Sequence, residues 1–260
     1  MAADLPLQGV GHEGCNPRAG SRQDADEKAQ EASAEDRAEI IRHSQIGERL
    51  AESVVARLAA SSTAIDVRRR RFVYRAGDAP DALYLVARGR VKLCSVESAT
   101  GREAVIDILP AGSLFGESAL YEAGVRQMSA VAFENARLLR VPVSEFKLAM
   151  GDSRELYDHT FRLLGQRLSR SERRVADFAL DAIPARLEKL LCDLSDRYGR
   201  PGPGGTIIDL NLPHREIASI VGSTRESVTV RLNDLRRAGV IDFVDRKILL
   251  KHRPAEGAAA

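Results

Sequence analysis

The sequence of 260 residues has room for two modest domains and one connecting element. Its hydrophobic fraction of 44% and charged fraction of 29% are typical of a soluble globular protein, and its net charge of +2 excludes a generally basic coat for nucleic acid. No apolar run reaches membrane-spanning length and the N-terminus lacks the pattern of a secretory signal, so a cytoplasmic protein without a membrane partner is expected.

The three cysteines, Cys15, Cys94 and Cys192, lie far apart and form no CxxC pair and no Cys/His ligand spacing. This distribution argues against a disulfide framework, an iron–sulfur cluster and a metal site. The Asp, Glu and His residues are scattered without a nucleophile or a metal-ligand spacing. The sequence therefore predicts no catalytic site and no enzyme.

Residues 1 to about 34 are rich in Gly, Ala, Ser, Glu and Asp and contain few large apolar side chains. Such a composition cannot bury enough surface to offset the entropy lost on ordering, and a disordered extension over residues 1–45 is predicted. Within it, residues 33–36 resemble a helix start that a short helix around residues 40–46 would follow. A second helix is predicted over residues 48–60, with Leu50, Val54 and Leu58 on one face.

Short apolar runs separated by glycines follow, and they predict an all-β roll or barrel in a domain placed at residues 46–143. The predicted strands are residues 72–74, 83–86, 91–94, 105–109 and 138–141. A run of four arginines, Arg68 to Arg71, precedes the first of them. The run has two interpretations, an anion-binding patch and a solvated strand edge. The edge is favoured because charge often protects exposed strand edges.

After Ser144 the period becomes helical, and a dimerisation helix is predicted over residues 144–183. Apolar positions at spacings of four and three form a heptad seam along which two copies are expected to pack as a homodimer. The seam consists of Tyr157, Phe161, Leu164, Leu168, Ser171, Val175, Phe178 and Ala182. A second stripe, Leu156 and Leu163, is expected to lie on the roll of the same chain. Pro184 fits the first turn of a new helix, so residues 181–183 form the predicted hinge.

The remaining domain, residues 184–260, carries the pattern of a helix-turn-helix. Between residues 184 and 253 there are 13 Lys/Arg and 9 Asp/Glu, a net charge of +4 with the sign that DNA phosphates require. An apolar face at residues 217–221 marks the first helix, Gly222 supplies the turn, and Ser223 or Thr224 caps the second helix. The second helix, Arg225 to Arg237, is expected to bury Val228, Leu232 and Leu235.

A strand-turn-strand pattern follows, with strands at residues 240–243 and 247–250 and a turn at Asp245-Arg246. A helix-turn-helix with such a wing is much more specific than either part alone. In this motif the N-terminal turn of the second helix meets base edges, where Arg can hold guanine and Glu can accept from cytosine. The predicted DNA-contacting residues are Thr224, Arg225, Glu226, Thr229, Val230 and Arg231.

The order of roll, long helix and winged helix-turn-helix resembles the Crp/Fnr superfamily of bacterial transcription regulators over residues 46–252. Three runs carry the resemblance, Phe115–Leu120, Ser129–Ala132 and Gly222–Thr229. It implies an α+β fold with a jelly-roll-like, cyclic-nucleotide-binding-like β-roll. It also implies a homodimer that binds double-stranded DNA at a palindromic promoter site, with half-sites about 34 Å apart, and RNA polymerase as a further partner. An effector held between roll and long helix would reorient the DNA-binding heads.

One departure from the family's pattern lies in the second helix of the helix-turn-helix, the reading helix, whose first turn meets the bases. Val230 stands where the family usually has a base-contacting arginine, and Arg231 lies one residue, about 100°, further around the helix. The half-site is therefore expected to differ from the usual one, and Val230 is expected to touch a thymine methyl group.

In the cyclic-nucleotide branch of this superfamily, Gly116 and Glu117 would meet the ribose. The arginine that neutralises the phosphate is replaced here by Met128, and the paired hydroxyls of the long helix become Ser171 and Glu172. A cyclic phosphate would then depend on backbone N–H groups or on Arg126.

The run from Arg126 to Phe133 is similar to that of the global nitrogen regulators that sense 2-oxoglutarate. In that branch an Arg at the position of Arg126, and an Arg and a Glu at those of Arg167 and Glu172, hold the ligand. Two guanidinium groups suit a dicarboxylate, but Glu117 replaces an apolar residue of that branch, and a surface ion pair is the alternative for Arg167 and Glu172. The effector-contacting residues predicted from both branches are Gly116, Glu117, Ser118, Arg126, Ser129, Arg167, Ser171 and Glu172.

The sequence thus predicts an effector-responsive DNA-binding transcription regulator, with 2-oxoglutarate or a cyclic nucleotide as the effector. The alternative is a ligand-binding regulatory module whose helical C-terminus binds a protein partner. Arg225, Glu226 and the wing favour DNA, because a protein-binding tail would not need them.

Overall fold

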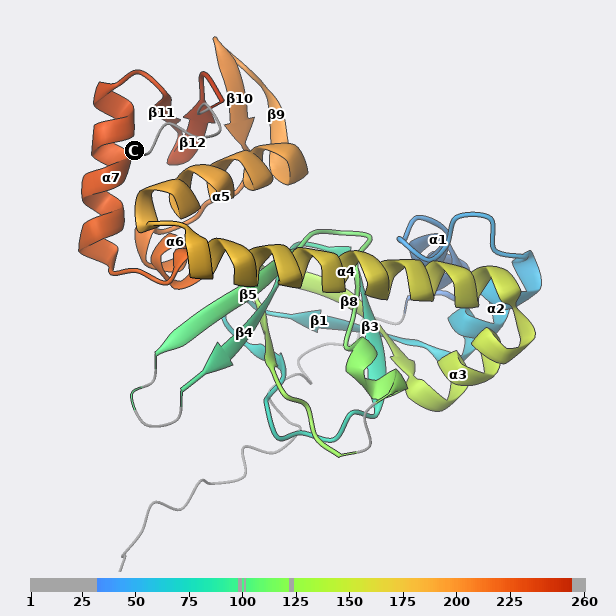
Figure 1. Ribbon diagram of the computed structural model, residues 1–260. Coiled ribbons are helices and arrows are strands. Elements are labelled where there is room, and N and C mark those ends of the chain that lie inside the picture. The colour runs from blue at the N-terminus through green and yellow to red at the C-terminus, as the bar shows by residue number, and fades with distance from the viewer. Residues whose placement is uncertain (1–31, 98–99, 101, 122–123, 254–260) are drawn as a thin grey trace, which may run out of the picture.

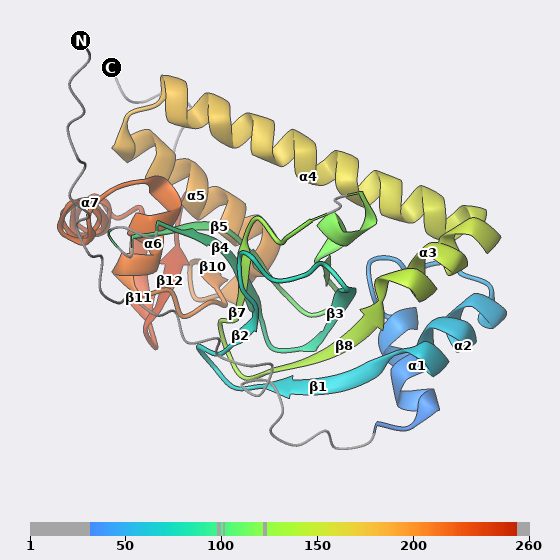
Figure 2. The ribbon, with the colours of Figure 1, turned by 90° about the horizontal axis from the view of Figure 1, so that it is seen from below.

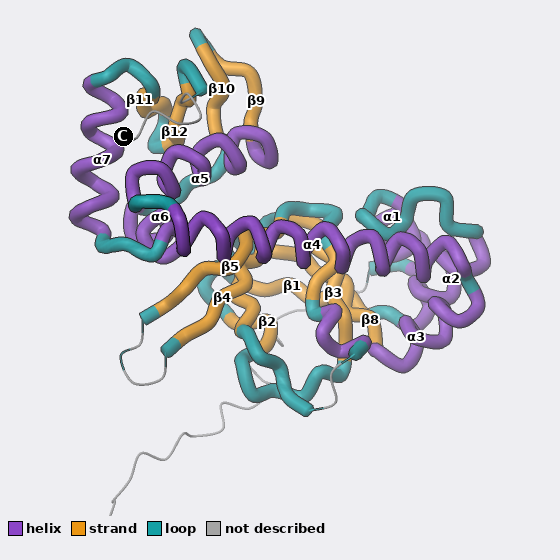
Figure 3. Tube along the Cα trace, in the orientation of Figure 1, coloured by secondary structure: helices purple, strands orange, loops and turns teal. Residues whose placement is uncertain are grey.

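The computed structural model describes residues 32–97, 100, 102–121 and 124–253. The described chain forms a β-roll with helices at one end, a long helix that runs along the roll, and a C-terminal head at the other end (Figure 1). Strands gather in two separate places, the roll and the head (Figure 3). None of the helices in these residues is long and apolar enough to cross a membrane.

Three short helices cover one end of the roll: α1 (Ala34–Arg42), α2 (Glu52–Ser61) and α3 (Val143–Asp152). Helix α1 begins with a capping box, in which the Ser33 hydroxyl accepts from the backbone N–H of Asp36 and the Asp36 carboxylate accepts from that of Ser33. Ile41 and Ile46 are completely buried against α2 and the roll. The predicted helix start at residues 33–36 is therefore confirmed, and the prediction of disorder as far as residue 45 is wrong for residues 32–45. Residues 1–31 lie outside the described chain.

The roll consists of two four-stranded antiparallel sheets, in the orders β1-β8-β3-β6 and β2-β7-β4-β5. The fold confirms the predicted α+β class and the glycine-punctuated roll. The strands are β1 (Thr63–Val67), β2 (Phe72–Tyr74), β3 (Ala82–Arg88), β4 (Val91–Val96), β5 (Glu103–Leu109), β6 (Leu114–Phe115), β7 (Ser129–Ala132) and β8 (Ala136–Pro142), with a 3-10 helix η2 (Glu117–Leu120) after β6.

Strand β3 is buried on both faces, which explains its continuous apolar sequence. Leu83 and Leu85 pack against the helices, while Tyr84 and Val86 pack between the two sheets. The arginine run forms the turn between β1 and β2, where Arg70 has a φ of 68°. The interpretation of this run as a strand edge was wrong, because its backbone turns here instead of extending.

The long helix α4 (Arg154–Leu180) begins at residue 154, and the predicted single helix is divided at Ser153. The Ser153 hydroxyl accepts from the backbone N–H of Leu156 and caps α4. Leu156 and Leu163 are buried against the roll, which confirms the second stripe. The helix ends at the predicted hinge, and α5 (Ile183–Tyr198) follows with Pro184 in its first turn. Figure 2 shows α4 along the roll and α5 turning back beside it.

The head contains α5, α6 (His214–Val221), α7 (Arg225–Arg237) and a four-stranded sheet in the order β11-β12-β10-β9. Its strands are β9 (Gly199–Gly202), β10 (Gly205–Ile208), β11 (Ile241–Val244) and β12 (Lys247–Leu250). The wing is confirmed, with Asp245 and Arg246 both at positive φ in its turn. Gly222 has a φ of 65°, the left-handed conformation that favours glycine, and a Cβ there would also require the Phe178 ring, 2.6 Å away, to shift.

Candidate functional site: reading surface and effector cluster

The first turn of α7 presents a polar surface. Arg225 and Glu226 are exposed, whereas Val228 on the opposite side of the helix is fully buried in the head. The Thr224 hydroxyl accepts from the backbone N–H of Ser227 at 3.2 Å and fixes the start of the helix. Thr224, rather than Ser223, is therefore the cap. The arrangement places an Arg and a Glu next to each other, open to solvent, at the positive end of the helix dipole.

The two residues at the departure from the family pattern lie differently. Val230 is 61% exposed next to the polar turn, and its side chain is free to meet an apolar base edge. Arg231 turns back toward α5, where its guanidinium lies 2.6 Å from the Glu188 carboxylate. The guanidinium of Arg231 is therefore held against the head itself and does not point out beside Arg225.

Thr229 is held by a contact that the sequence did not predict. Its hydroxyl donates to the backbone carbonyl of Arg225 at 2.8 Å, so its oxygen accepts from Nδ1 of His214, also at 2.8 Å. Burial, followed by the charge of Arg225, lowers the pKa of His214 and so favours the neutral form of its ring. The His214 ring also lies 6.5 Å from that of Phe243 in the wing. Because fifteen residues separate the partners, no local spacing could reveal the contact.

The predicted effector residues meet where β6 ends. Arg126, only 2% exposed, donates to the carbonyl of Gly116 at 2.7 Å and to that of Ala82, and its guanidinium lies 4.4 Å from the centre of the Tyr74 ring. A Cβ on Gly116 would lie 3.1 Å from this guanidinium. Gly116 has a φ of 78°, so both conformation and space select glycine.

Arg167 of α4 reaches the same place from the other side. It donates to the carbonyl of Leu114 and forms an ion pair with Glu117, and both side chains are largely buried. The structure therefore brings together Gly116, Glu117, Arg126 and Arg167, which we call the effector cluster. Its two guanidinium groups already have protein partners, and one of these partners is a carboxylate.

The other predicted effector residues lie outside the closest contacts. The Ser118 hydroxyl is 3.5 Å from Arg126, and the Ser129 hydroxyl accepts from the backbone N–H of Ala76 at 2.9 Å. Ser171 and Glu172 are exposed on α4. Within one protomer, the structure does not join these last two residues to the effector cluster.

A charged contact that the sequence did not predict links the roll to the head. Lys92 of β4 lies 3.0 Å from the Glu216 carboxylate of α6 and 2.6 Å from that of Glu103 on β5. The side chains of Lys92 and Glu216 are each only 8% exposed. Nearby, Arg197 of α5 lies 2.7 Å from the Asp107 carboxylate of the roll. The head is thus docked on the roll through ion pairs as well as through apolar side chains.

The two domains match two protein-family descriptions. Residues 64–152 match the cyclic nucleotide-binding domain, and residues 185–255 match the Crp-like helix-turn-helix domain. The matched ranges fall on the roll with α3 and on the head, and the whole of α4 lies between them.

Two characterised transcription regulators are similar to the chain over most of its length. The chain is 32% identical over 188 residues to the global nitrogen regulator of Synechocystis sp., covering 72% of this chain and 83% of the relative. It is 28% identical over 212 residues to the CRP-like cAMP-activated global transcriptional regulator of Mycobacterium tuberculosis, covering 82% of this chain and 94% of the relative.

Solved structures agree in fold. The c-di-GMP responsive global regulator CLP of Xanthomonas campestris superposes with a TM-score of 0.68 at 23% identity, over 78% of this chain and all of that one. A CRP/FNR-family transcriptional regulator of Thermus thermophilus superposes with a TM-score of 0.60 at 28% identity, over 72% of this chain and 92% of that one. Because its roll matches the cyclic nucleotide-binding domain, its head matches the Crp-like helix-turn-helix domain, and it is 32% identical to a global nitrogen regulator, the chain belongs to the Crp/Fnr family of DNA-binding transcription regulators.

Proposed function

We propose that the protein acts as a homodimer on palindromic promoter DNA and that a small anionic effector controls it. The observation that carries the dimer is the outer face of α4. Tyr157, Phe161, Leu168, Val175 and Phe178 are between 47% and 69% exposed, although all five belong to the heptad seam. A stripe of large apolar side chains along a helix indicates a protein partner, and a second copy of α4 supplies a matching stripe.

Arg225 is the residue that we expect to contribute most to base choice. Replacing Arg225 with Ala should weaken binding to the specific site by about 1–3 kcal/mol and relax base preference at one position of each half-site. The specific site would first be selected from random DNA with the unmodified protein, and affinities would then be measured by gel shift. Arg237→Ala is the matched control, because it removes the same charge at the other end of α7. Equal losses in the two variants would make the effect one of charge alone.

RNA polymerase completes the set of proposed partners, since control of transcription from a promoter requires contact with it. This partner rests on membership of the family and on no particular surface of the chain.

The effector proposal rests on the effector cluster. Arg126 and Arg167 converge from the roll and from α4, so a ligand held by both would connect the sensing domain to the helix that leads to the head. Two guanidinium groups suit the two carboxylates of 2-oxoglutarate. A cyclic nucleotide is the second candidate, because the Glu117 carboxylate can accept from ribose hydroxyl groups. Calorimetry against 2-oxoglutarate, cyclic AMP and cyclic GMP tests the choice directly.

Glu117 has opposite consequences for the two candidates. It is the carboxylate that neutralises Arg167, so an incoming dicarboxylate must displace it. Replacing Glu117 with Gln should therefore raise the affinity for 2-oxoglutarate about tenfold, roughly 1.4 kcal/mol, by leaving Arg167 without an acid. The same change should lower the affinity for a cyclic nucleotide.

Glu39→Gln is the control for this experiment, because Glu39 is an exposed carboxylate of α1 far along the chain from the cluster. The affinities would be obtained by calorimetry at one pH and ionic strength. If Glu117→Gln bound all three compounds with unchanged affinity, the effector cluster would not be the effector site. The proposal that the protein binds DNA would not be affected by that result.

A further inference from the structure

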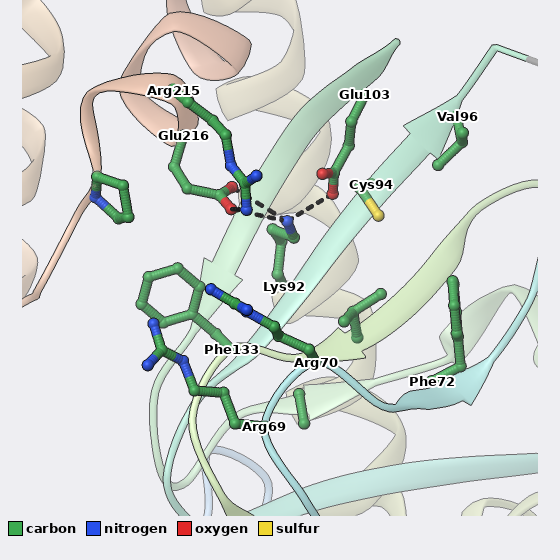
Figure 4. Close-up of a pocket in the computed structure, with 13 residues that line it drawn as sticks. Arg69, Arg70, Phe72, Lys92, Cys94, Val96, Glu103, Phe133, Arg215 and Glu216 are labelled. Atoms are coloured by element: carbon green, nitrogen blue, oxygen red, sulfur yellow. Dashed lines mark hydrogen bonds and ion pairs between the residues drawn. The ribbon is translucent and has the colours of Figure 1, made fainter. Parts of the chain in front are cut away.

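A basic cavity lies between the roll and the head, apart from the effector cluster. It has a volume of about 250 Å³. Its walls come from the β1–β2 turn, β2, β4, β5 and β7 of the roll and from the start of α6 (Figure 4). No residue of the effector cluster lines it. The cavity therefore exists only while the head is docked on the roll.

Three arginines supply its positive charge. Arg69 and Arg70 come from the β1–β2 turn, and Arg215 comes from α6. Figure 4 shows the guanidinium groups of Arg69 and Arg70 near the Phe133 ring, and Arg215 extending beside Glu216 toward Lys92. Among the residues that the structure describes, no carboxylate pairs with Arg69 or Arg70, and Arg215 has only a contact of 3.9 Å with Glu216.

The two acids of the cavity do not neutralise these arginines. Glu103 and Glu216 both pair with Lys92, at 2.6 Å and 3.0 Å. Four cations therefore face two carboxylates, and the excess positive charge lies on the arginines. Such an excess inside a walled space raises the local concentration of anions.

The β1–β2 turn is fixed by backbone contacts that hold the arginines at the cavity. Arg70 has a left-handed φ of 68°, a backbone conformation that residues other than glycine adopt only at a cost in free energy. Its backbone N–H donates to the carbonyl of Ala132 at 2.7 Å. The N–H of Arg69 donates to the side-chain oxygen of Asn135 at 2.8 Å. The turn therefore presents both guanidinium groups from a backbone that is already ordered.

Size limits what could bind. A volume of 250 Å³ corresponds to about eight water molecules and lies below the range of about 300–1,000 Å³ that holds drug-sized ligands. Phe72 and Phe133 add apolar wall on the side of the roll. We propose that this cavity binds a small multivalent oxyanion, inorganic phosphate or a short phosphorylated metabolite, between Arg69 and Arg70 of the roll and Arg215 of the head. The bound anion would hold the head in its docked position.

The test is calorimetric titration of the full chain with inorganic pyrophosphate and with inorganic phosphate at constant ionic strength. The double variant Arg69→Gln/Arg70→Gln removes two charges that line the cavity. Arg68→Gln/Arg71→Gln removes two charges of the same run that do not line it. We expect the first pair of changes to weaken pyrophosphate binding at least tenfold and the second to change it less than twofold. Arg69→Lys/Arg70→Lys should recover part of the affinity.

Four results would overturn the proposal. The first is that the unmodified chain binds no pyrophosphate at pyrophosphate concentrations up to about 10 mM. A second is an equal loss in both double variants, which would mean diffuse attraction to the arginine run. A third is loss in Arg167→Gln with full retention in Arg69→Gln/Arg70→Gln, which would place the anion in the effector cluster. The fourth is that Arg69→Gln/Arg70→Gln lowers the affinity for DNA but leaves pyrophosphate binding unchanged, which would assign these arginines to contacts with DNA phosphates.

Discussion

Replacing Leu168 with Glu is expected to convert the protein from a dimer to a monomer and to abolish specific DNA binding. Leu168 lies in the middle of the seam and is 60% exposed in the single chain. In a paired seam, two carboxylates related by symmetry would be buried against apolar side chains, which costs several kcal/mol for each unpaired charge. A monomer reaches only one half-site, so its affinity for the palindrome should fall by a factor of roughly 10³ or more.

Gln166→Glu is the matched control for Leu168→Glu. Gln166 is exposed on the same helix but lies outside the heptad positions of the seam, so its replacement by Glu adds the same charge away from the proposed interface. Sedimentation equilibrium of both variants measures the change in association. If Leu168→Glu remained a dimer, the seam would not be the interface, and the exposed stripe of α4 would need another partner.

Replacing Lys92 with Met is expected to loosen the head from the roll. The change leaves the Glu216 carboxylate, which is 8% exposed, without its cation and close to Glu103. Removing one partner of a buried ion pair typically costs about 3–5 kcal/mol. The cost here cannot exceed the free energy of docking, because undocking returns both acids to water. The expected result is therefore faster backbone hydrogen exchange and proteolysis at the hinge, residues 181–183.

The double variant Lys92→Met/Glu216→Met separates loss of a cation from loss of packing. It removes the buried acid as well, and Glu103 can reach solvent because its side chain is 31% exposed. Hinge protection should therefore return toward that of the unmodified chain. A single variant as well protected as the unmodified chain would show that Lys92 does not hold the head, and a double variant as exposed as the single would assign the effect to packing.

The head was the part most closely predicted from the sequence, because its signals are local. The bounds of the reading helix α7 followed from the turn at Gly222, the cap at Thr224 and the apolar spacing that comes after them. The wing followed from the turn at Asp245 between two apolar runs. The hairpin of β9 and β10 was missed, since a Pro/Gly-rich run also marks an irregular loop. The break at Ser153 was missed because a helical period continues on both sides of it.

The residues of the effector cluster were predicted from the family resemblance, and the structure adds the contacts that these residues make with one another. Nothing in the sequence shows that Glu117 neutralises Arg167, because fifty residues separate them. The same holds for the contact between Lys92 and Glu216, and for the approach of Arg215 to Arg69 and Arg70 at the cavity between the roll and the head. Lys92 meets Glu216, and Arg215 meets Arg69 and Arg70, only when the head is docked on the roll, so this chemistry belongs to the tertiary structure and to no local pattern.

One measurement tests the central claim most directly, that two chains joined along α4 place two Arg225-bearing helices on one duplex. The protein would be mixed with a palindromic duplex selected from random DNA, and the mass of the complex would be measured by sedimentation over a range of salt concentrations. We predict two chains per duplex and an affinity that falls steeply as salt rises. One chain per duplex, or no salt-dependent binding to any selected DNA, would contradict the account.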